Sequence, residues 1–502
     1  MNDTTTPPAK PSRLARARQL AGKGAIVLLV AYLLLLIPDT SPPPPQGAGK
    51  QSFQWQRDAL WTALEKQFQE MRGQGCEKLS APIEDSLTKI RRDIDGLEST
   101  PRTSESSLFE SLETNFFHLA PMVAACPQRL REFLAAYARM RTAVKHQSES
   151  WRMDSPSARE RLYRSLYGGR AAVEEAMLQV PGEKIPALLA GNDEPSATPS
   201  NVVQGVTLHS GDILVSRGGA AASALIARGN DFPGNFSHVA LVHVSETNQA
   251  ISVIESHIEC GVVVSPLEKY LRDTKLRIMV LRLRADLPSL KADPFLPHKA
   301  AARALQEATS HHIPYDFAMD YSDPSKQFCS EVASAADQPL GIKLWMGISH
   351  LSTPGVTAWL SVLGVQHFTT QEPSDLEYDP QLRVVAEWHD QQTLFRDHVD
   401  NAVIDAMLES ADAGAPLRYN PWMLPVARVV KACSVGMNWF GAIGPIPEGM
   451  SATTALRVAR LKRDHAALRA EVLERVGKFR TDQGYVPPYW EMVRLAREAM
   501  RL

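Results

Sequence analysis

The sequence shows no excess of charge of either sign. It has 54 Lys and Arg against 56 Asp and Glu, a formal net charge of −2 over 502 residues. Proteins that bind nucleic acids usually carry a strongly basic domain, so we expect no nucleic-acid partner. The composition is 44% hydrophobic and 22% charged, which is ordinary for a globular protein. A chain of this length predicts two to four domains.

Several motifs of metal and cofactor sites are also missing. No CxxC pair occurs among the cysteines, and the sequence contains neither an HExxH motif nor a Gly-rich phosphate-binding loop. These absences argue against a zinc ribbon, a thioredoxin-like redox site, a metalloprotease of that type and a nucleotide-binding loop. We therefore expect no metal and no cofactor. The five cysteines are Cys76, Cys126, Cys260, Cys329 and Cys433.

Residues 24–38 form an uninterrupted apolar run that basic residues precede. The run is shorter than the roughly 20 residues of a typical membrane span. A basic flank favours the cytoplasmic side, so the rest of the chain is expected across the membrane. No A-x-A cleavage site follows, which favours an uncleaved signal anchor over a cleaved signal peptide or a buried helix. We predict a single-pass inner-membrane protein with its main part in the periplasm. The preceding basic residues are Arg13, Arg16, Arg18 and Lys23.

Composition and periodicity divide the rest of the chain. A Pro- and Gly-rich stretch reads as a stiff linker, and helical periodicity on both sides surrounds a region of short β-branched runs. The expected parts are a cytoplasmic basic N-terminus (1–23), a membrane anchor (24–38), a linker (39–50), a helical domain (51–190), an α+β domain (203–390) and a helical C-terminal region (391–502). Cys76 and Cys126 fall in the first helical domain. They would pair in an oxidising compartment, but two unpaired buried cysteines fit the sequence equally well.

The α+β region predicts an antiparallel sheet. Its strands are expected in "GDILVSR", "SHVALVHVS", "AISVIESHI", "GVVVS" and "LRIMVLRLR", separated by turn residues. "SETNQ" predicts a tight turn, so the second and third of these strands should form a hairpin. One register pairs His238 with Glu255 and the other pairs it with His257. Since residues two apart share a face of a strand, either register brings a carboxylate close to the His238 imidazole.

Cys329, in "KQFCSEVASAA", is the third chemically interesting residue. The run of small residues after it predicts a helix, with the cysteine in its first turn. A helix N-terminus and a protonated histidine both favour a thiolate. Cys329, His238 and Glu255 would then form a nucleophile, a base and an orienting group. The alternative for Cys329 is packing, because free cysteine is among the most buried residue types.

The order of these motifs resembles a known family. "GDILVSR", "SHVALV", "VIES", "GVVVSPLEKYL" and "YDFAMDYSDPSKQFCSEV" together resemble the circularly permuted NlpC/P60 hydrolases of the papain-like superfamily, in particular the YiiX/YebB-like group. In that group the histidine strand comes first and the cysteine helix last. The resemblance implies a permuted papain-like domain in which Cys329 is the nucleophile, His238 the base and Glu255 the orienting group. Residues 203–334 carry it, and the helical regions on both sides are not explained by it.

Other residues of this region receive weaker assignments. Gly211 and Asp212 match the family's start-of-strand motif and are read as structural, and Phe328 stands where the family often has Tyr. The backbone N–H of Cys329 is a natural donor to the oxyanion of the tetrahedral intermediate. His257 is an alternative orienting group. Ser237, Tyr315 and Tyr321 are near enough to line a cleft, although each suits a structural role better.

The resemblance implies a membrane-anchored, periplasmic cysteine hydrolase. Its expected reaction proceeds through a thioester and cleaves amide bonds of cell-wall peptides, so the expected substrate partner is a peptidoglycan-type peptide. A lipid substrate is the first alternative, through acyl hydrolysis or acyl transfer with the same three residues, and the apolar stretch at residues 420–430 favours it. The second alternative is a non-catalytic scaffold. No feature of the sequence indicates a protein partner.

Overall fold

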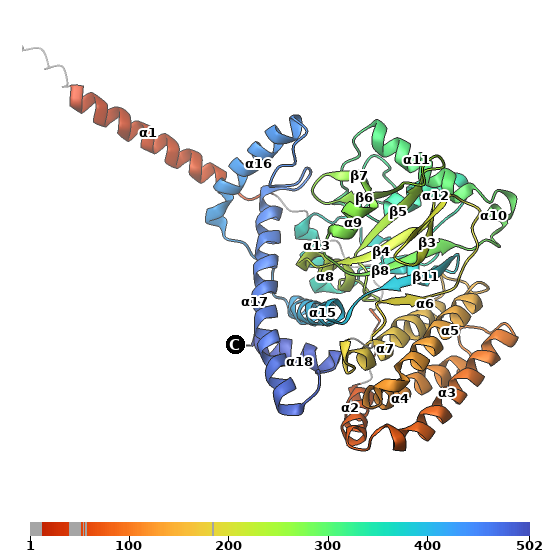
Figure 1. The fold of residues 1–502 in the computed structure, drawn as a ribbon. Coiled ribbons are helices and arrows are strands. Elements are labelled where there is room, and N and C mark those ends of the chain that lie inside the picture. Colours follow the sequence, from red (N-terminus) through yellow and green to blue (C-terminus); the bar gives the residue numbers. More distant parts are fainter. Residues whose placement is uncertain (1–12, 40–51, 54, 56–57, 183–184, 502) are drawn as a thin grey trace, which may run out of the picture.

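The computed structural model describes residues 13–39, 52–53, 55, 58–182 and 185–501. Most of the basic N-terminus and of the linker, residues 1–12 and 40–50, therefore lies outside the described residues. Figure 1 shows three layers of structure: a bundle of helices from the N-terminal half, a central sheet, and C-terminal helices beside it. A single helix, α1, projects away from this body.

The centre of the protein is a seven-stranded sheet in which every pair of neighbours is antiparallel. Its order is β1-β11-β8-β4-β5-β6-β7. The five strands predicted from β-branched runs are all present, which confirms an α+β fold with an antiparallel sheet. The sequence analysis missed two strands at one side of the sheet, β1 and β11. The strands are β1 (Leu188–Ala190), β4 (Ile213–Gly218), β5 (His238–Val244), β6 (Ile251–His257), β7 (Gly261–Pro266), β8 (Lys275–Leu283) and β11 (Leu382–Trp388).

Both faces of the sheet are buried. Alternate residues of a strand point to opposite faces, and Ile213 and Val215 accordingly pack with the small residues Ala300 and Ala333 of α11 and α12. Leu214, between them, faces a second apolar cluster on the other side. The helices around the sheet are α8 (Ala221–Arg228), α9 (Leu267–Arg272), α10 (Pro288–Ala292), α11 (Leu296–Ser310), α12 (Glu331–Asp337), α13 (Pro354–Leu363) and α14 (Asp375–Tyr378). Two short hairpins complete this part: β2 (Ser200–Val203) with β3 (Val206–His209), and β9 (Ser349–His350) with β10 (Thr369–Thr370).

The N-terminal helices pack around an apolar core that is largely their own. They are α2 (Asp58–Arg72), α3 (Cys76–Ser99), α4 (Ser107–Ala125), α5 (Leu130–Ser148), α6 (Pro156–Leu162) and α7 (Gly168–Leu178). Cys76 and Cys126 form a disulfide with 4.9 Å between their Cα atoms. The bond joins the start of α3 to the end of α4, so the pairing that the sequence left open is present.

The C-terminal helices pack on the sheet domain through α15, which contacts β8, α8 and α13. They are α15 (Gln391–Asp412), α16 (Leu424–Trp439), α17 (Ala452–Gln483) and α18 (Tyr489–Met500). Ser451 accepts a hydrogen bond from the backbone N–H of Thr454 at 3.0 Å. It is thus the N-cap of α17.

Buried ion pairs join the three parts of the chain. Arg277 of β8 donates to Glu174 of α7 at 2.5 Å and to Asp397 of α15 at 2.9 Å. Glu387 of β11 lies 3.5 Å from the same guanidinium and 3.2 Å from Arg141 of α5. All these side chains are at most 3% exposed. Removing one partner from such a group leaves an uncompensated buried charge, so this Arg277 network fixes the helices against the sheet.

The N-terminal apolar run lies in α1 (Arg13–Leu35). Most of its described apolar side chains are exposed, for example Leu28 at 73%. α1 contacts α16 near its C-terminal end. Within the described residues, no helix combines the length and the apolar character needed to cross a membrane.

Candidate active site

His238 and Glu255 meet at one end of the central sheet. His238 is the first residue of β5, and Glu255 lies on the neighbouring strand β6. Ala240 pairs with Glu255, which is the register that sets His238 opposite His257 rather than opposite Glu255. Alternation keeps Glu255 on the same face. The His238 Nε2 atom lies 2.8 Å from the Glu255 Oε2 atom.

Glu255 is shared between two histidines. Its second oxygen, Oε1, lies 3.1 Å from the Nε2 atom of His257, while only 1% of the Glu255 side chain is exposed. Burial alone would raise the pKa of Glu255, but the hydrogen bonds of His238 and His257 outweigh it and hold this pKa below its usual range. The carboxylate is therefore charged, and it orients His238. His257 contacts the carboxylate from the other side.

The pKa values of the two imidazoles shift in opposite directions. Burial lowers the pKa of His238, although the bond to Glu255 opposes this change. For His257 the hydrogen bond to Glu255 is the larger effect and raises the pKa against burial. His238 is consequently a neutral imidazole near pH 7, with one ring nitrogen held by Glu255. Its Nδ1 atom is the nitrogen that remains for a second partner.

The Cys329 thiol lies beside the backbone at the start of β5. Its Sγ atom donates to the carbonyl oxygen of Ser237 at 3.9 Å, and the backbone N–H of Val239 also acts on the thiol. These two residues flank His238 in the chain. The structure therefore brings the thiol to the backbone on both sides of the histidine.

The expectation of a thiolate at a helix N-terminus is not met. Cys329 lies in the turn before α12, two residues ahead of its first residue, and α12 has only seven residues. Burial is the dominant influence and raises the pKa of Cys329 to about 12. Desolvation disfavours the charged form of a thiol, and here it exceeds the effect of the short helix. Cys329 is thus a neutral, buried thiol.

The segment before Cys329 is tied to the histidine hairpin. Ser256 of β6 donates its hydroxyl to the carbonyl oxygen of Gln327 at 2.6 Å. Phe328 donates its backbone N–H to the Glu331 carboxyl at 2.6 Å, which closes the turn before α12. These bonds place the cysteine turn against the strand that carries Glu255. The sequence analysis assigned no role to Ser256 or Glu331, although both lie in the motifs that carry the resemblance.

The other candidate residues of the site differ in their burial and in their nearness to the Cys329 thiol. Tyr315 lies within electrostatic range of the thiol, and burial raises its pKa well above 10. Tyr321 is 38% exposed. Glu372, which the sequence analysis also missed, is buried within electrostatic range of Cys329, and burial raises its pKa well above 4.5. No short-range signal could have connected Glu372 with a cysteine so far away in the chain.

Gly211 and Asp212 have structural roles. Gly211 has a φ of 96°, and a Cβ atom there would lie 2.3 Å from Pro297. Asp212 binds Arg282 through both oxygens, at 2.7 and 2.8 Å. As for metals, among the described residues no three or more His, Cys, Asp or Glu side chains are grouped to hold an ion.

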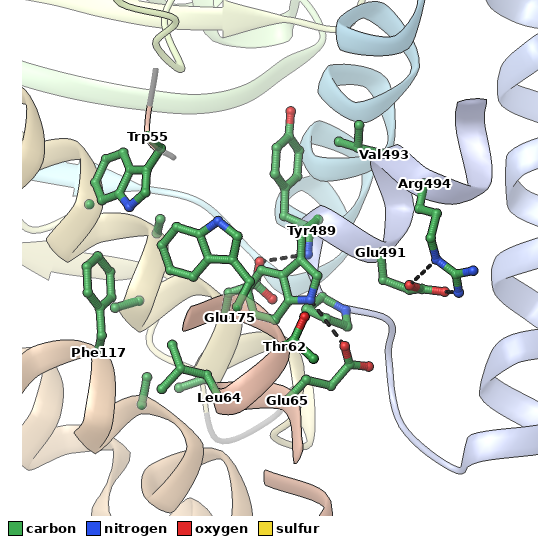
Figure 2. Close-up of a pocket in the computed structure, with 18 of the residues that line it drawn as sticks. Trp55, Thr62, Leu64, Glu65, Phe117, Glu175, Tyr489, Glu491, Val493 and Arg494 are labelled. Atoms are coloured by element: carbon green, nitrogen blue, oxygen red, sulfur yellow. Dashed lines mark hydrogen bonds and ion pairs between the residues drawn. The ribbon is translucent and has the colours of Figure 1, made fainter. Parts of the chain in front are cut away.

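A large cavity lies away from these residues, between the N-terminal helices and α18 (Figure 2). It measures about 840 Å³ and is rich in aromatic side chains, and neither Cys329, His238 nor Glu255 lines it. Glu65 accepts from Trp490 at 3.2 Å, and Glu175 accepts from the backbone N–H of Tyr489 at 2.9 Å. The bonds join helices from opposite ends of the chain across the cavity.

Comparison with known proteins identifies the sheet domain. A solved structure titled as the metalloprotein yiiX from Escherichia coli O157:H7 matches at 21% identity, over 36% of this chain and 97% of that one, with a TM-score of 0.29. No curated protein matches. Residues 207–386 match the model of a family described as permuted papain-like amidase enzymes, YaeF/YiiX, C92 family. This match confirms the resemblance seen in the sequence, and residues 207–386 are a permuted papain-like cysteine hydrolase domain.

Proposed function

We propose that this protein is a membrane-anchored periplasmic hydrolase that cleaves amide bonds of cell-wall peptides with Cys329, His238 and Glu255. One observation carries the assignment of these residues. The His238 imidazole is held by Glu255 at 2.8 Å, while the Cys329 thiol lies against the backbone that flanks this histidine. A nucleophile, a base and an orienting carboxylate are the parts that a papain-like hydrolase needs.

The protonation states favour general-base catalysis. Because Glu255 is ionised and accepts from Nε2–H of His238, the unprotonated nitrogen of the ring is Nδ1. As Sγ attacks the carbonyl carbon, the thiol proton passes to Nδ1. The imidazolium then gives this proton to the leaving amine, and a thioester to Cys329 remains. Water, deprotonated by His238, hydrolyses the thioester and restores the thiol.

Glu255 stabilises this cycle at its charged stage. The imidazolium forms in a buried place, where an unpaired charge would be costly, and the carboxylate next to it compensates that charge. The backbone N–H of Cys329 is the proposed first donor to the oxyanion. The Ser330 side chain hydrogen-bonds the thiol, and Tyr315 lies within electrostatic range of it.

Two features support the proposed location. The Cys76–Cys126 disulfide suits an oxidising compartment such as the periplasm. Basic residues precede the apolar run of α1, an arrangement that favours a cytoplasmic N-terminus and an exported body. A reporter that is active only in the periplasm, fused after the last residue, should be active. Activity of a cytoplasm-dependent reporter alone would contradict the location.

The chemistry is tested by incubating the full chain with peptidoglycan fragments and analysing the products by mass. Cys329→Ala should abolish turnover. Cys433→Ala is the matched control, because this cysteine is exposed on α16 and outside the site. Cleavage that persists in the Cys329→Ala protein would refute the assignment of the nucleophile.

A lipid substrate is the second candidate. The observation that favours it is the exposed apolar surface of α16, which includes Val426 and Val429 at 51% and 58% exposure. Acyl hydrolysis or acyl transfer would use the same thioester. Incubation with phospholipids in place of peptidoglycan fragments distinguishes the two substrates, since only one set of products should depend on Cys329.

A further inference from the structure

The helix α16 carries an apolar face that points to solvent. Trp439 and Phe440, at its C-terminal end, are 82% and 89% exposed. Soluble proteins rarely expose a continuous apolar patch of this kind without a function. The exposed apolar residues of the turn before α16, the helix and the segment after it are Trp422, Met423, Val426, Val429, Val435, Met437, Trp439, Phe440 and Ile443. We refer to them as the α16 face.

Charged groups are absent from this face. The sequence has no acidic residue between Asp412 and Glu448. The two cations of α16 bond to other parts of the protein: Arg428 donates to Asp39 at 2.9 Å, and Lys431 donates to the carbonyl oxygen of Pro447 at 2.8 Å. The opposite side of the helix is packed on α17. The helix thus packs one apolar side on α17 and turns another apolar side outward.

The α16 face adjoins the apolar helix α1. The Tyr32 hydroxyl donates to the carbonyl oxygen of Trp422 at 2.9 Å, and Arg428 donates to the carbonyl oxygen of Ile37 at 2.6 Å. Thr453 of α17 donates to Asp39 at 2.8 Å. Figure 1 shows α16 running across the C-terminal end of α1 rather than alongside it. The exposed apolar side chains of α1 and of α16 therefore belong to two helices that touch at the C-terminal end of α1.

We propose that the α16 face lies in the surface of a lipid bilayer. If α1 is aligned with the bilayer normal, a helix crossing its end lies parallel to the membrane at the water boundary. Amphipathic helices occupy this position with their apolar side toward the acyl chains. Trp is enriched at the same depth because its ring is apolar and its N–H is polar.

This contact goes beyond an anchor. An anchor alone leaves the body free to rotate about its attachment, whereas a second contact with the bilayer fixes one orientation. It rests on the proposed anchor and does not depend on the reaction of Cys329. The bilayer is the favoured occupant because the α16 face adjoins the exposed apolar residues of α1 and consists of uncharged side chains that offer a protein partner no ion pair.

The test uses the exposed Cys433, which lies on α16 itself. The full chain, with Cys260 replaced by Ser, is labelled at Cys433 with an environment-sensitive fluorophore and reconstituted into vesicles of phosphatidylethanolamine and phosphatidylglycerol. Lipids with a spin label near the headgroup serve as quenchers. The Cys433 probe should lose emission when these lipids are present. The matched control carries Cys433→Ser and Glu474→Cys, at an exposed position of α17, and should keep its emission.

A second variant tests the contact without moving the probe. Trp439→Ser with Phe440→Ser changes two exposed side chains, so the fold should persist, and quenching at Cys433 should fall.

Each other outcome is decisive. A chain that floats with the vesicles while its Cys433 probe stays quenchable only by aqueous iodide refutes the α16 contact and leaves the anchor intact. A probe shielded from both iodide and lipid means that another copy or a protein covers the face, which also refutes the proposal. A chain that does not float refutes the contact and the anchor together. None of these outcomes affects the assignment of the hydrolase residues.

Discussion

The protonation state of Cys329 makes a measurable prediction about alkylation. Burial raises the pKa of this thiol to about 12, so at about pH 7.5 the thiolate fraction is on the order of 3 × 10⁻⁵, against about 0.1 for a free cysteine of pKa about 8.5. The more basic thiolate is intrinsically more nucleophilic, which recovers a factor of about 40. Cys329 should therefore react about 80-fold more slowly with iodoacetamide than an ordinary exposed cysteine.

The assay follows alkylation of the full chain by peptide mass analysis, with the exposed Cys433 as the internal standard. Between about pH 6 and about pH 10 the Cys329 rate should rise about tenfold per pH unit without a plateau, because the thiol pKa lies above this range. His238→Ala should change the rate little, since the histidine is not needed to form the small thiolate fraction. The reasoning would be refuted by a plateau between about pH 5 and about pH 8 that disappears in His238→Ala. That result would mean a preformed thiolate–imidazolium pair.

Three further predictions concern positioning and stability. Glu255→Gln should lower the pKa of His238 in an NMR titration, because Glu255 raises it, and should reduce turnover by about 10- to 10⁴-fold; an unchanged pKa would contradict the orienting role. The folded protein holds the pKa of Glu255 below its value in the unfolded chain, so this carboxylate stabilises the fold at pH values above the unfolded-state pKa. That stabilisation is lost as the pH falls from the unfolded-state pKa through the folded-state pKa. Glu255→Gln should therefore lose less stability than the unmodified protein on acidification. Cys76→Ser opens a disulfide with a sequence separation of 50 and should reduce the free energy of unfolding by about 4 kcal/mol in urea titrations; a midpoint insensitive to reductant would count against it. Gly211→Ala forces a Cβ atom against Pro297 and a left-handed φ, so Tm should drop by several degrees, corresponding to more than about 1 kcal/mol.

The sequence predicted the parts of the fold that depend on short-range patterns. The strands around His238 and Glu255 are β-branched runs of the right length, bounded by turn residues, and such runs form strands in most contexts. Alternation along a strand was enough to bring Glu255 to His238 without knowing the register. The order of these motifs also identified the family.

The sequence could not predict properties that depend on packing. The sequence predicted a Cys329 thiolate, and this was wrong. Residues distant in the chain bury the thiol, and this burial raises its pKa more than the short helix can lower it. The strand β11 was missed although "LRVVAEW" is a plausible strand, because its partner β8 lies about a hundred residues earlier in the chain. The buried Glu372 belongs to no motif at all. The sequence analysis noted the apolar stretch at residues 420–430, but which of its side chains face outward depends on how α16 packs on α17.

The Arg277 network has a consequence for how this hydrolase can be divided. A recombinant fragment of residues 203–390 would retain Arg277 and Glu387 but lose Glu174 and Asp397, which come from α7 and α15. The guanidinium would lose two of its three carboxylate partners together with the helices that carry them, whereas breaking a single buried pair already costs about 3–5 kcal/mol. The family domain is therefore not an independent module in this chain. Residues outside 203–390 contribute ion pairs that stabilise the sheet domain, so the helices on both sides belong to the same folding unit.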